Sequence, residues 1–173
     1  SGGAFDDEDY LWLKDYLQLD GMVYKLVPIK NTPSKDGGPM DMGQIDADKM
    51  YNIVTKWHWG NSNGNIYHDP ETRRNSITYR TNLSRLMNQL IAEGKIDKAK
   101  NIINLAMTKM PLDKFGYYSL VEPFSEGYYK VGEKQKAQDL LNKLVQKYKE
   151  NLNYYATLSG ADQSDLAIDI ITD

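Results

Sequence analysis

The sequence of 173 residues contains no cysteine, only two histidines and no long hydrophobic run. Without cysteine the chain can form neither a disulfide scaffold nor a thiolate nucleophile nor a cysteine-based metal site. Residues 22–29 are the longest apolar stretch, but Lys25 and Pro28 interrupt it, and a membrane span needs ~20 apolar residues. Phosphate-binding glycine loops, G-x-S-x-G turns and H-E-x-x-H helices are also absent. We therefore predict no catalytic site, no cofactor, no metal ion and no membrane span in this chain.

The composition is that of one ordinary globular domain, with 40% hydrophobic and 26% charged residues. Area scaling indicates that about 70% of the surface of the unfolded chain can be buried on folding, which is enough for a core. The net charge of -3 does not favour binding to nucleic acid or to anionic lipid. Because the chain opens with Ser-Gly-Gly and has no signal peptide, we expect a piece of a larger protein. An expression remnant and a disordered acidic lead then occupy 1–9, and a single domain occupies 10–173.

The N-terminal part of that domain, 10–45, is expected to contain a short helix, a strand and a loop. Acidic residues precede Tyr10 and favour the start of a helix there. The β-branched and aromatic residues of 22–29 predict a strand, which Pro28 confines to an edge or an end. Proline and glycine residues over 30–44 indicate a surface loop.

Residues 46–70 are expected to form a capping helix and a loop. Asp46 is a favourable residue for the N-cap of this helix. Apolar side chains then recur at the spacing of one buried helical stripe: Met50, Ile53, Val54 and Trp57. The helix should end at Gly60, where an asparagine- and glycine-rich loop begins and runs to about Pro70.

The second half of the chain contains an internal repeat. Residues 94–104 align with residues 132–142, and Gly94 and Gly132 are separated by 38 residues. In each copy one helical stripe precedes the glycine and another follows it. The glycine allows the first helix to end in the left-handed conformation, so each copy is predicted to be a helix-turn-helix hairpin.

This arrangement resembles the tetratricopeptide repeat, whose period is 34 residues. The first copy matches that family's apolar positions well, including its terminal proline: Leu83, Leu86, Met87, Leu90, Ala99, Ile103, Ala106 and Pro111. The second copy keeps Gly132, Ala137 and Leu141 but has Leu144 for the second alanine and Lys149 for the proline.

The fold class implied by this resemblance is mainly α, with antiparallel helical hairpins of tetratricopeptide-like type, an α-α superhelix, and a small N-terminal β element. We expect the first hairpin over 71–113 and the second over 114–158. Because two repeats are fewer than the three usually needed to bury a continuous face, the helix at 46–58 and a C-terminal helix over 161–173 are expected to act as caps.

A second resemblance covers about residues 10–158. It is carried by the run from Tyr16 to Ile29, by Trp59-Gly60-Asn61 and Arg73-Arg74, and by the repeat. The chain resembles the C-terminal region of large bacterial inner-membrane proteins of a domain-of-unknown-function class, similar to protein O-mannosyltransferases. The resemblance implies a periplasmic, tetratricopeptide-like appendage of a multi-spanning membrane domain of glycosyltransferase type. It carries over no catalytic residue, since the sugar chemistry would belong to the membrane part.

The arginines are confined to one predicted helix: Arg73, Arg74, Arg80 and Arg85. On a helical wheel they lie away from the leucine stripe of the same helix. They form either a solvated face paired with acids such as Asp69 and Glu71, or a local anion site, because the guanidinium fork suits carboxylate and phosphate. Arg73, Arg74 and Arg80 are the candidate binding residues of this group.

Three aromatic residues surround the predicted loop. Trp57 continues the buried stripe and is expected in the core. Trp59 either anchors the following loop or joins Tyr67 in a surface that stacks on a sugar or a peptide. We therefore include Trp59 and Tyr67 among the candidate binding residues.

Two metal sites were weighed and are not expected. A zinc site would require His58, His68 and Asp69 to converge with a further ligand, although the histidines lack zinc-ligand spacing. Alternating asparagines offer oxygens, but the acidic ligands of a calcium loop are missing around Asn61, Asn63 and Asn65.

These features predict a non-catalytic helical interaction domain on the periplasmic side of a bacterial inner membrane. It would dock a protein or peptide partner, such as a glycan acceptor or the membrane part of its own parent. The alternative is a glycan-binding or carbohydrate-processing domain that uses exposed tryptophan and tyrosine.

Overall fold

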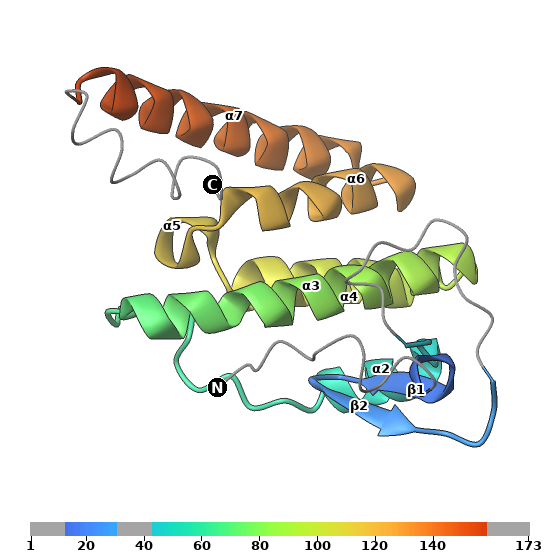
Figure 1. The fold of residues 1–173 in the computed structure, drawn as a ribbon. Coiled ribbons are helices and arrows are strands. Elements are labelled where there is room, and N and C mark those ends of the chain that lie inside the picture. Colours follow the sequence, from blue (N-terminus) through green and yellow to red (C-terminus); the bar gives the residue numbers. More distant parts are fainter. Residues whose placement is uncertain (1–12, 31–42, 159–173) are drawn as a thin grey trace. The chain divides into compact units, whose positions relative to one another are not determined.

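The structure, a computed structural model, describes residues 13–30 and 43–158. The expected lead over 1–9, the C-terminal helix over 161–173 and most of the loop over 30–44 lie outside the described residues. The chain divides between His58 and Trp59 into two compact units, and each is described by itself. Within the described residues the fold is mainly helical with one two-stranded antiparallel sheet (Figure 1), as predicted.

The N-terminal unit contains a β-hairpin formed by β1 (Leu17–Asp20) and β2 (Val23–Leu26). The strands are antiparallel, with Leu17 opposite Leu26 and Asp20 opposite Val23, and Gly21 takes the positive φ of 74° that the turn requires. The strand predicted over 22–29 is thus confirmed for its first part and ends before the proline. Its partner β1 was not predicted.

The helix expected to start at Tyr10 is present in the described residues only as a single 3-10 turn, η1 (Lys14–Tyr16). Leu17, the residue after this turn, begins β1. The reason is tertiary: Leu19 of β1 is completely buried, and β1 packs against the helix that follows the hairpin. This packing outweighs a weak local preference for helix.

That following helix, α2 (Ala47–Val54), begins as predicted. Asp46 is its N-cap and accepts a hydrogen bond from the backbone N–H of Lys49 at 3.0 Å. Met50 and Val54 of the predicted stripe are fully buried.

The end of α2 differs from the prediction, since the helix stops at Val54 rather than near Gly60. The Thr55 hydroxyl donates to the carbonyl of Tyr51 at 2.7 Å, and the N–H of Trp57 bonds to the carbonyl of Val54, three residues back. Trp57 is therefore half-buried outside the helix. Its ring lies against Gly21, where an added Cβ would be 2.8 Å from a ring carbon.

The C-terminal unit consists of two helical hairpins and the segment that connects them (Figure 1). The first hairpin is α3 (Pro70–Ala92) with α4 (Ile96–Lys109), and the second is α6 (Glu122–Lys130) with α7 (Lys134–Ala156). The connection contains α5 (Leu112–Phe115) and the 3-10 turn η2 (Tyr118–Val121).

The two hairpin turns have the same backbone geometry. Each contains a glycine with positive φ: Gly94 at 71° and Gly132 at 85°. The N–H of Lys95 bonds to the carbonyl of Leu90, and the N–H of Glu133 bonds to the carbonyl of Tyr128, both at 2.8 Å. The described residues therefore contain two helix-turn-helix hairpins with matching turns.

The core of the C-terminal unit is formed by apolar side chains from both hairpins. Residues no more than 6% exposed include Leu83, Leu86, Met87 and Leu90 of α3, Ala99, Ile102, Ile103 and Ala106 of α4, Phe124 and Tyr128 of α6, and Ala137 and Leu144 of α7. None of the helices in the described part of the chain combines the length and the apolar character that a membrane span requires.

The two hairpins approach closely at Gly127 of α6. A Cβ atom at this position would lie 2.3 Å from the sulfur of Met87 on α3 and 3.2 Å from Cδ1 of Ile103 on α4. Glycine at this position thus allows α6 to pack directly on the first hairpin.

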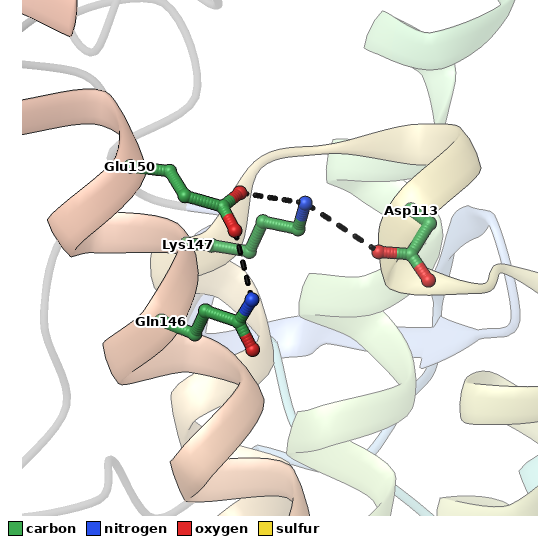
Figure 2. Close-up of polar contacts among 4 residues, drawn as sticks. All are labelled: Asp113, Gln146, Lys147 and Glu150. Atoms are coloured by element: carbon green, nitrogen blue, oxygen red, sulfur yellow. Dashed lines mark hydrogen bonds and ion pairs between the residues drawn. The ribbon is translucent and has the colours of Figure 1, made fainter.

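Helix α7 makes a polar contact with α5 (Figure 2). Lys147 lies between Asp113 of α5, at 4.0 Å, and Glu150 of its own helix, at 2.9 Å. Gln146 donates a hydrogen bond to the same Glu150 carboxylate at 2.9 Å. Hydrogen bonds from Lys147 and then Gln146 hold the pKa of Glu150 below its ordinary value.

Candidate binding surface at the start of helix α3

The loop before α3 is folded into a defined shape. We call residues 59–69 the anchored loop. At its start, the ring of Trp59 packs on the ring of Tyr79 of α3, with 5.6 Å between the centroids. The loop then turns, with the N–H of Gly64 bonded to the carbonyl of Asn61 at 2.8 Å. Trp59 thus anchors the loop, which is one of the two roles expected for it.

Two side chains hold the middle of the anchored loop against α5. His68 is 7% exposed, its Nε2 lies 2.8 Å from the carbonyl oxygen of Ser62, and its ring packs on Phe115 at 4.4 Å between centroids. The ammonium of Lys114 donates hydrogen bonds to the carbonyls of Gly64 and, at 3.4 Å, of Asn63. The loop backbone is therefore tied to an element some fifty residues further along the chain.

The end of the anchored loop is fixed by the N-cap of α3. Asp69 accepts hydrogen bonds from the backbone N–H groups of Glu71 and Thr72 at 3.0 Å and from the Thr72 hydroxyl at 2.6 Å. The Thr72 hydroxyl first, and then the backbone N–H groups, hold the pKa of Asp69 below its ordinary value of 3.8. Asp69 thus serves as a helix cap, whereas one of the two interpretations of the arginines paired it with them.

The anchored loop displays two large side chains to solvent. Tyr67 is 84% exposed and Ile66 is 46% exposed. Arg74 of α3 is also exposed, and Arg73 is half-exposed with a buried Nε that has no hydrogen-bond partner among the described residues. We define Ile66, Tyr67, Arg73 and Arg74 as the candidate binding surface. It combines an aromatic ring, an apolar side chain and guanidinium groups, the chemistry that recognises peptides and carboxylates.

Arg80 does not lie on a solvated face, and its expected position away from the apolar stripe is wrong. Its side chain is fully buried. Nη2 donates to the carbonyl of Met110 at 3.0 Å, and Nη1 donates to the carbonyls of Gly116 and, at 3.3 Å, of Tyr117. Burial lowers the pKa of Arg80 to about 10. This guanidinium serves the fold by joining α3 to the connection between the hairpins.

The expectation was wrong because Arg80 lies on the apolar side of α3. Arg80 comes three residues before Leu83 and seven before Met87, a spacing that brings these side chains to one side of the helix. Ser76, four residues before Arg80, lies on the same side, and both residues are buried in a helix that contacts α5 and η2.

The residues of the zinc alternative have other roles or lie apart in the chain. His68 contacts Ser62 and Phe115, Asp69 caps α3, and His58 belongs to the N-terminal unit. Over residues 13–30 and 43–158, no three histidine, cysteine, aspartate or glutamate side chains form a group that could hold a metal ion. In the loop with calcium-like spacing, the Lys114 ammonium lies on the backbone carbonyls.

Sequence reasoning missed Lys114 and Ile66. No local pattern links Lys114 to a loop fifty residues earlier, so its role required the fold. Ile66 offered a weak signal, because it is an apolar residue within an otherwise polar loop.

Fold and surface define this chain as a mainly helical protein with two stacked helical hairpins and a small β-hairpin unit. A family model described as TMEM260-associated domain 2 matches residues 1–49. This description ties the matched residues to a membrane protein, as was expected, and the match includes the run from Tyr16 to Ile29. Helices α3 to α7 lie outside the matched range. The comparisons with curated proteins and with solved structures gave no match.

Proposed function

We propose that this chain is a non-catalytic interaction domain that docks a protein partner through the candidate binding surface. The observation that carries the proposal is that the backbone of the anchored loop is held in place while the side chain of Tyr67 is exposed to solvent. Tyr67 is 84% exposed, while the loop that bears it is held by Trp59, His68 and Lys114. A side chain on a fixed backbone loses little conformational freedom when it binds, and tyrosine and arginine dominate the energetics of many interfaces.

We also propose that the two hairpins are tetratricopeptide-like repeats. The matching turns at Gly94 and Gly132, and the close packing of successive hairpins at Gly127, support this interpretation. Repeats of this kind stack and present extended surfaces for partners.

We propose that the chain acts as part of a larger membrane protein. The family description of residues 1–49 names a domain associated with a membrane protein, which supports an appendage of a larger membrane protein. On the resemblance to bacterial proteins similar to O-mannosyltransferases, the parent is a glycosyltransferase-like protein and the domain faces the periplasm. The docked partner is then an acceptor protein or the membrane part of the parent.

Site-specific photocrosslinking in the full-length parent tests this role. A photoreactive phenylalanine analogue replaces Tyr67, and a matched protein carries it at the exposed residue Gln138 of α7. We expect a defined crosslinked species from position 67, absent at position 138 and lost when Arg74→Glu is added. Equal crosslinking at both positions, or none at position 67, would contradict the proposal.

Glycan binding is the alternative, and the exposed ring of Tyr67 on a fixed loop favours it to the same extent. A sugar titration followed by tryptophan fluorescence distinguishes the two functions. A flat response supports protein docking. A saturable change that Tyr67→Ala abolishes would replace docking by glycan recognition.

A further inference from the structure

Helix α7 carries an exposed apolar stripe along one side. Leu141 is 41% exposed, Val145 43% and Leu152 64%. Tyr148 is half-buried and lies between Val145 and Leu152, so the four residues follow one another at intervals of four, three and four. This spacing keeps side chains on one side of a helix and is the spacing along which two long helices pack side by side. The stripe therefore has the form of a helix–helix contact.

Two other sides of α7 have neighbours within the chain. Ala137 and Leu144 are buried, and the hydroxyl of Ser125 on α6 donates a hydrogen bond to the carbonyl of Ala137 at 3.2 Å. On a further side, Lys147 reaches Asp113 of α5 (Figure 2). The stripe is thus the apolar side of α7 that packing among residues 59–158 leaves exposed to solvent. Contiguous exposed apolar side chains mark interaction sites.

The stripe is complementary to a reversed copy of itself, because its intervals of four, three and four residues are the same in both directions along the helix. A second α7 that runs antiparallel places Leu141 of one chain opposite Leu152 of the other, and Val145 opposite Tyr148. Each layer of this contact then consists of apolar or aromatic side chains from both chains. A two-fold axis makes the same surface serve both copies, so the assembly closes as a dimer.

The lysines of α7 favour this direction over a parallel one. Lys134 lies on the stripe itself, seven residues before Leu141. In a parallel pair the two Lys134 side chains would face each other, and like charges opposite one another are unfavourable. The antiparallel pair moves them to opposite ends of the contact. It also brings Lys149, at the edge of the stripe, nearest to the uncharged Asn142 of the second copy.

We propose that this chain forms a two-fold symmetric dimer in which the α7 helices of two copies pack antiparallel through Leu141, Val145, Tyr148 and Leu152. The contact extends ~17 Å along α7, which is short for an interface and predicts a dimer that dissociates on dilution. This inference concerns the exposed side of α7 and does not rest on the proposed function.

Sedimentation velocity of the 173-residue chain tests the association. We expect monomer at ~1 μM and an increasing share of dimer towards ~300 μM. Leu141→Glu and Leu152→Lys should each weaken dimerisation at least about tenfold, because each places a charge opposite a leucine. The double variant pairs the two new charges across the dimer and should associate at least about threefold more tightly than either single variant.

The control variant is Lys143→Glu, which changes a charge at an exposed position on the other side of α7 and should leave dimerisation unchanged. Circular dichroism of every variant establishes that the helices are retained. A monomer at all concentrations would overturn the proposal and assign the stripe to another occupant, such as the chain beyond Leu158 or a different protein. A dimer that none of the stripe variants weakens would overturn it equally.

An engineered cysteine pair tests the direction, because the natural chain has no cysteine to interfere. One protein carries Leu141→Cys with Leu152→Cys. These positions are ~17 Å apart along one helix, too far for a disulfide, so each bond must join two chains. The matched control carries Lys143→Cys with Tyr154→Cys, which have the same separation in sequence and are exposed on the other side of α7.

Under mild oxidation we expect the stripe pair to crosslink at least about tenfold faster than the control pair, because association raises the local concentration of the thiols. Peptide mapping by mass spectrometry should find position 141 linked to position 152. Equal rates for the two pairs would overturn the proposal. Bonds that join 141 to 141 and 152 to 152 would show a parallel contact and would also overturn the antiparallel dimer.

Discussion

Arg80 shows how a charged residue can be part of the interior of a small helical unit. Its guanidinium is fully buried and donates hydrogen bonds to three backbone carbonyls. The chain adopts positive φ at Gly116 and Tyr117, two of the residues whose carbonyls it binds. A buried charge is tolerated when hydrogen bonds replace water, and removing it leaves the carbonyls without donors.

We therefore predict that Arg80→Leu lowers the free energy of unfolding by about 3 kcal/mol, because three carbonyls lose their hydrogen-bond donor. Arg74→Leu is the matched control on the same helix, and its effect should remain within about 0.5 kcal/mol, as for most exposed positions. Urea denaturation followed by circular dichroism measures both. Equal losses for the two variants would contradict the structural role of Arg80.

Asp69 makes the stability of the C-terminal unit depend on pH in the acid range. Its pKa in the folded chain is below the ordinary 3.8 that it has when unfolded, so its stabilising contribution is complete above 3.8 and is lost as the pH falls through the lower folded value. Asp69→Asn keeps an acceptor for the cap and does not titrate. We expect the urea midpoints of the two proteins to differ by a constant amount above about pH 5 and to converge in acid. A difference that persists unchanged to pH 2 would exclude this origin.

At the scale of the element, Gly127 determines how closely the two hairpins pack. Alanine favours helix over glycine by about 1 kcal/mol, so a substitution in an exposed helix would stabilise it. At Gly127 the new methyl group would lie 2.3 Å from the Met87 sulfur and 3.2 Å from Cδ1 of Ile103, so the surrounding side chains or the helix itself must shift.

We predict that Gly127→Ala destabilises the protein by about 1–3 kcal/mol, the range found for overpacked cores. The double variant Gly127→Ala with Met87→Ala should lose less than the sum of the two single variants, since the first substitution fills space that the second creates. Thermal and urea denaturation of the four proteins provide the comparison. Additive losses would mean that the two side chains do not meet.

Helices could be predicted from the sequence where a helical spacing of apolar residues coincides with a capping residue at the start or a glycine at the end. Asp46 before α2, and the glycines after α3 and α6, gave element starts and ends close to those observed. Strand β1 and the early end of α2 could not be predicted. Both depend on contacts made after folding: the burial of Leu19 in β1, and the Thr55 hydroxyl bonded to its own helix end.

At the scale of the whole molecule, the described chain has two compact units. Among residues 59–158, the apolar core of the C-terminal unit is formed by α3 to α7 and their connections. We expect residues 59–158, produced without the N-terminal unit, to retain helical circular dichroism and to unfold cooperatively in urea. A helical spectrum without a cooperative transition would show that this unit needs further chain to fold.

The candidate binding surface was only partly accessible to sequence reasoning. Tyr67, Arg73 and Arg74 were singled out by residue type and clustering. They differ from Arg80 in the solvent exposure of their side chains. This exposure depends on the packing of α5 and η2 on α3, and these elements follow Arg80 by thirty or more residues in the chain. Residue type therefore identified candidates, and long-range packing selected among them.

The Lys114 contact has a consequence for chemical reactivity. An amine must present a free lone pair to attack an acylating reagent, and the Lys114 ammonium is engaged by the carbonyls of Asn63 and Gly64. Lys114 should therefore react more slowly than exposed lysines such as Lys143. Once acylated, its nitrogen loses the positive charge and keeps a single N–H, so it can no longer donate to both carbonyls. Lysine acylation at this one position would thus release Tyr67 from its fixed presentation without altering any residue of the surface itself.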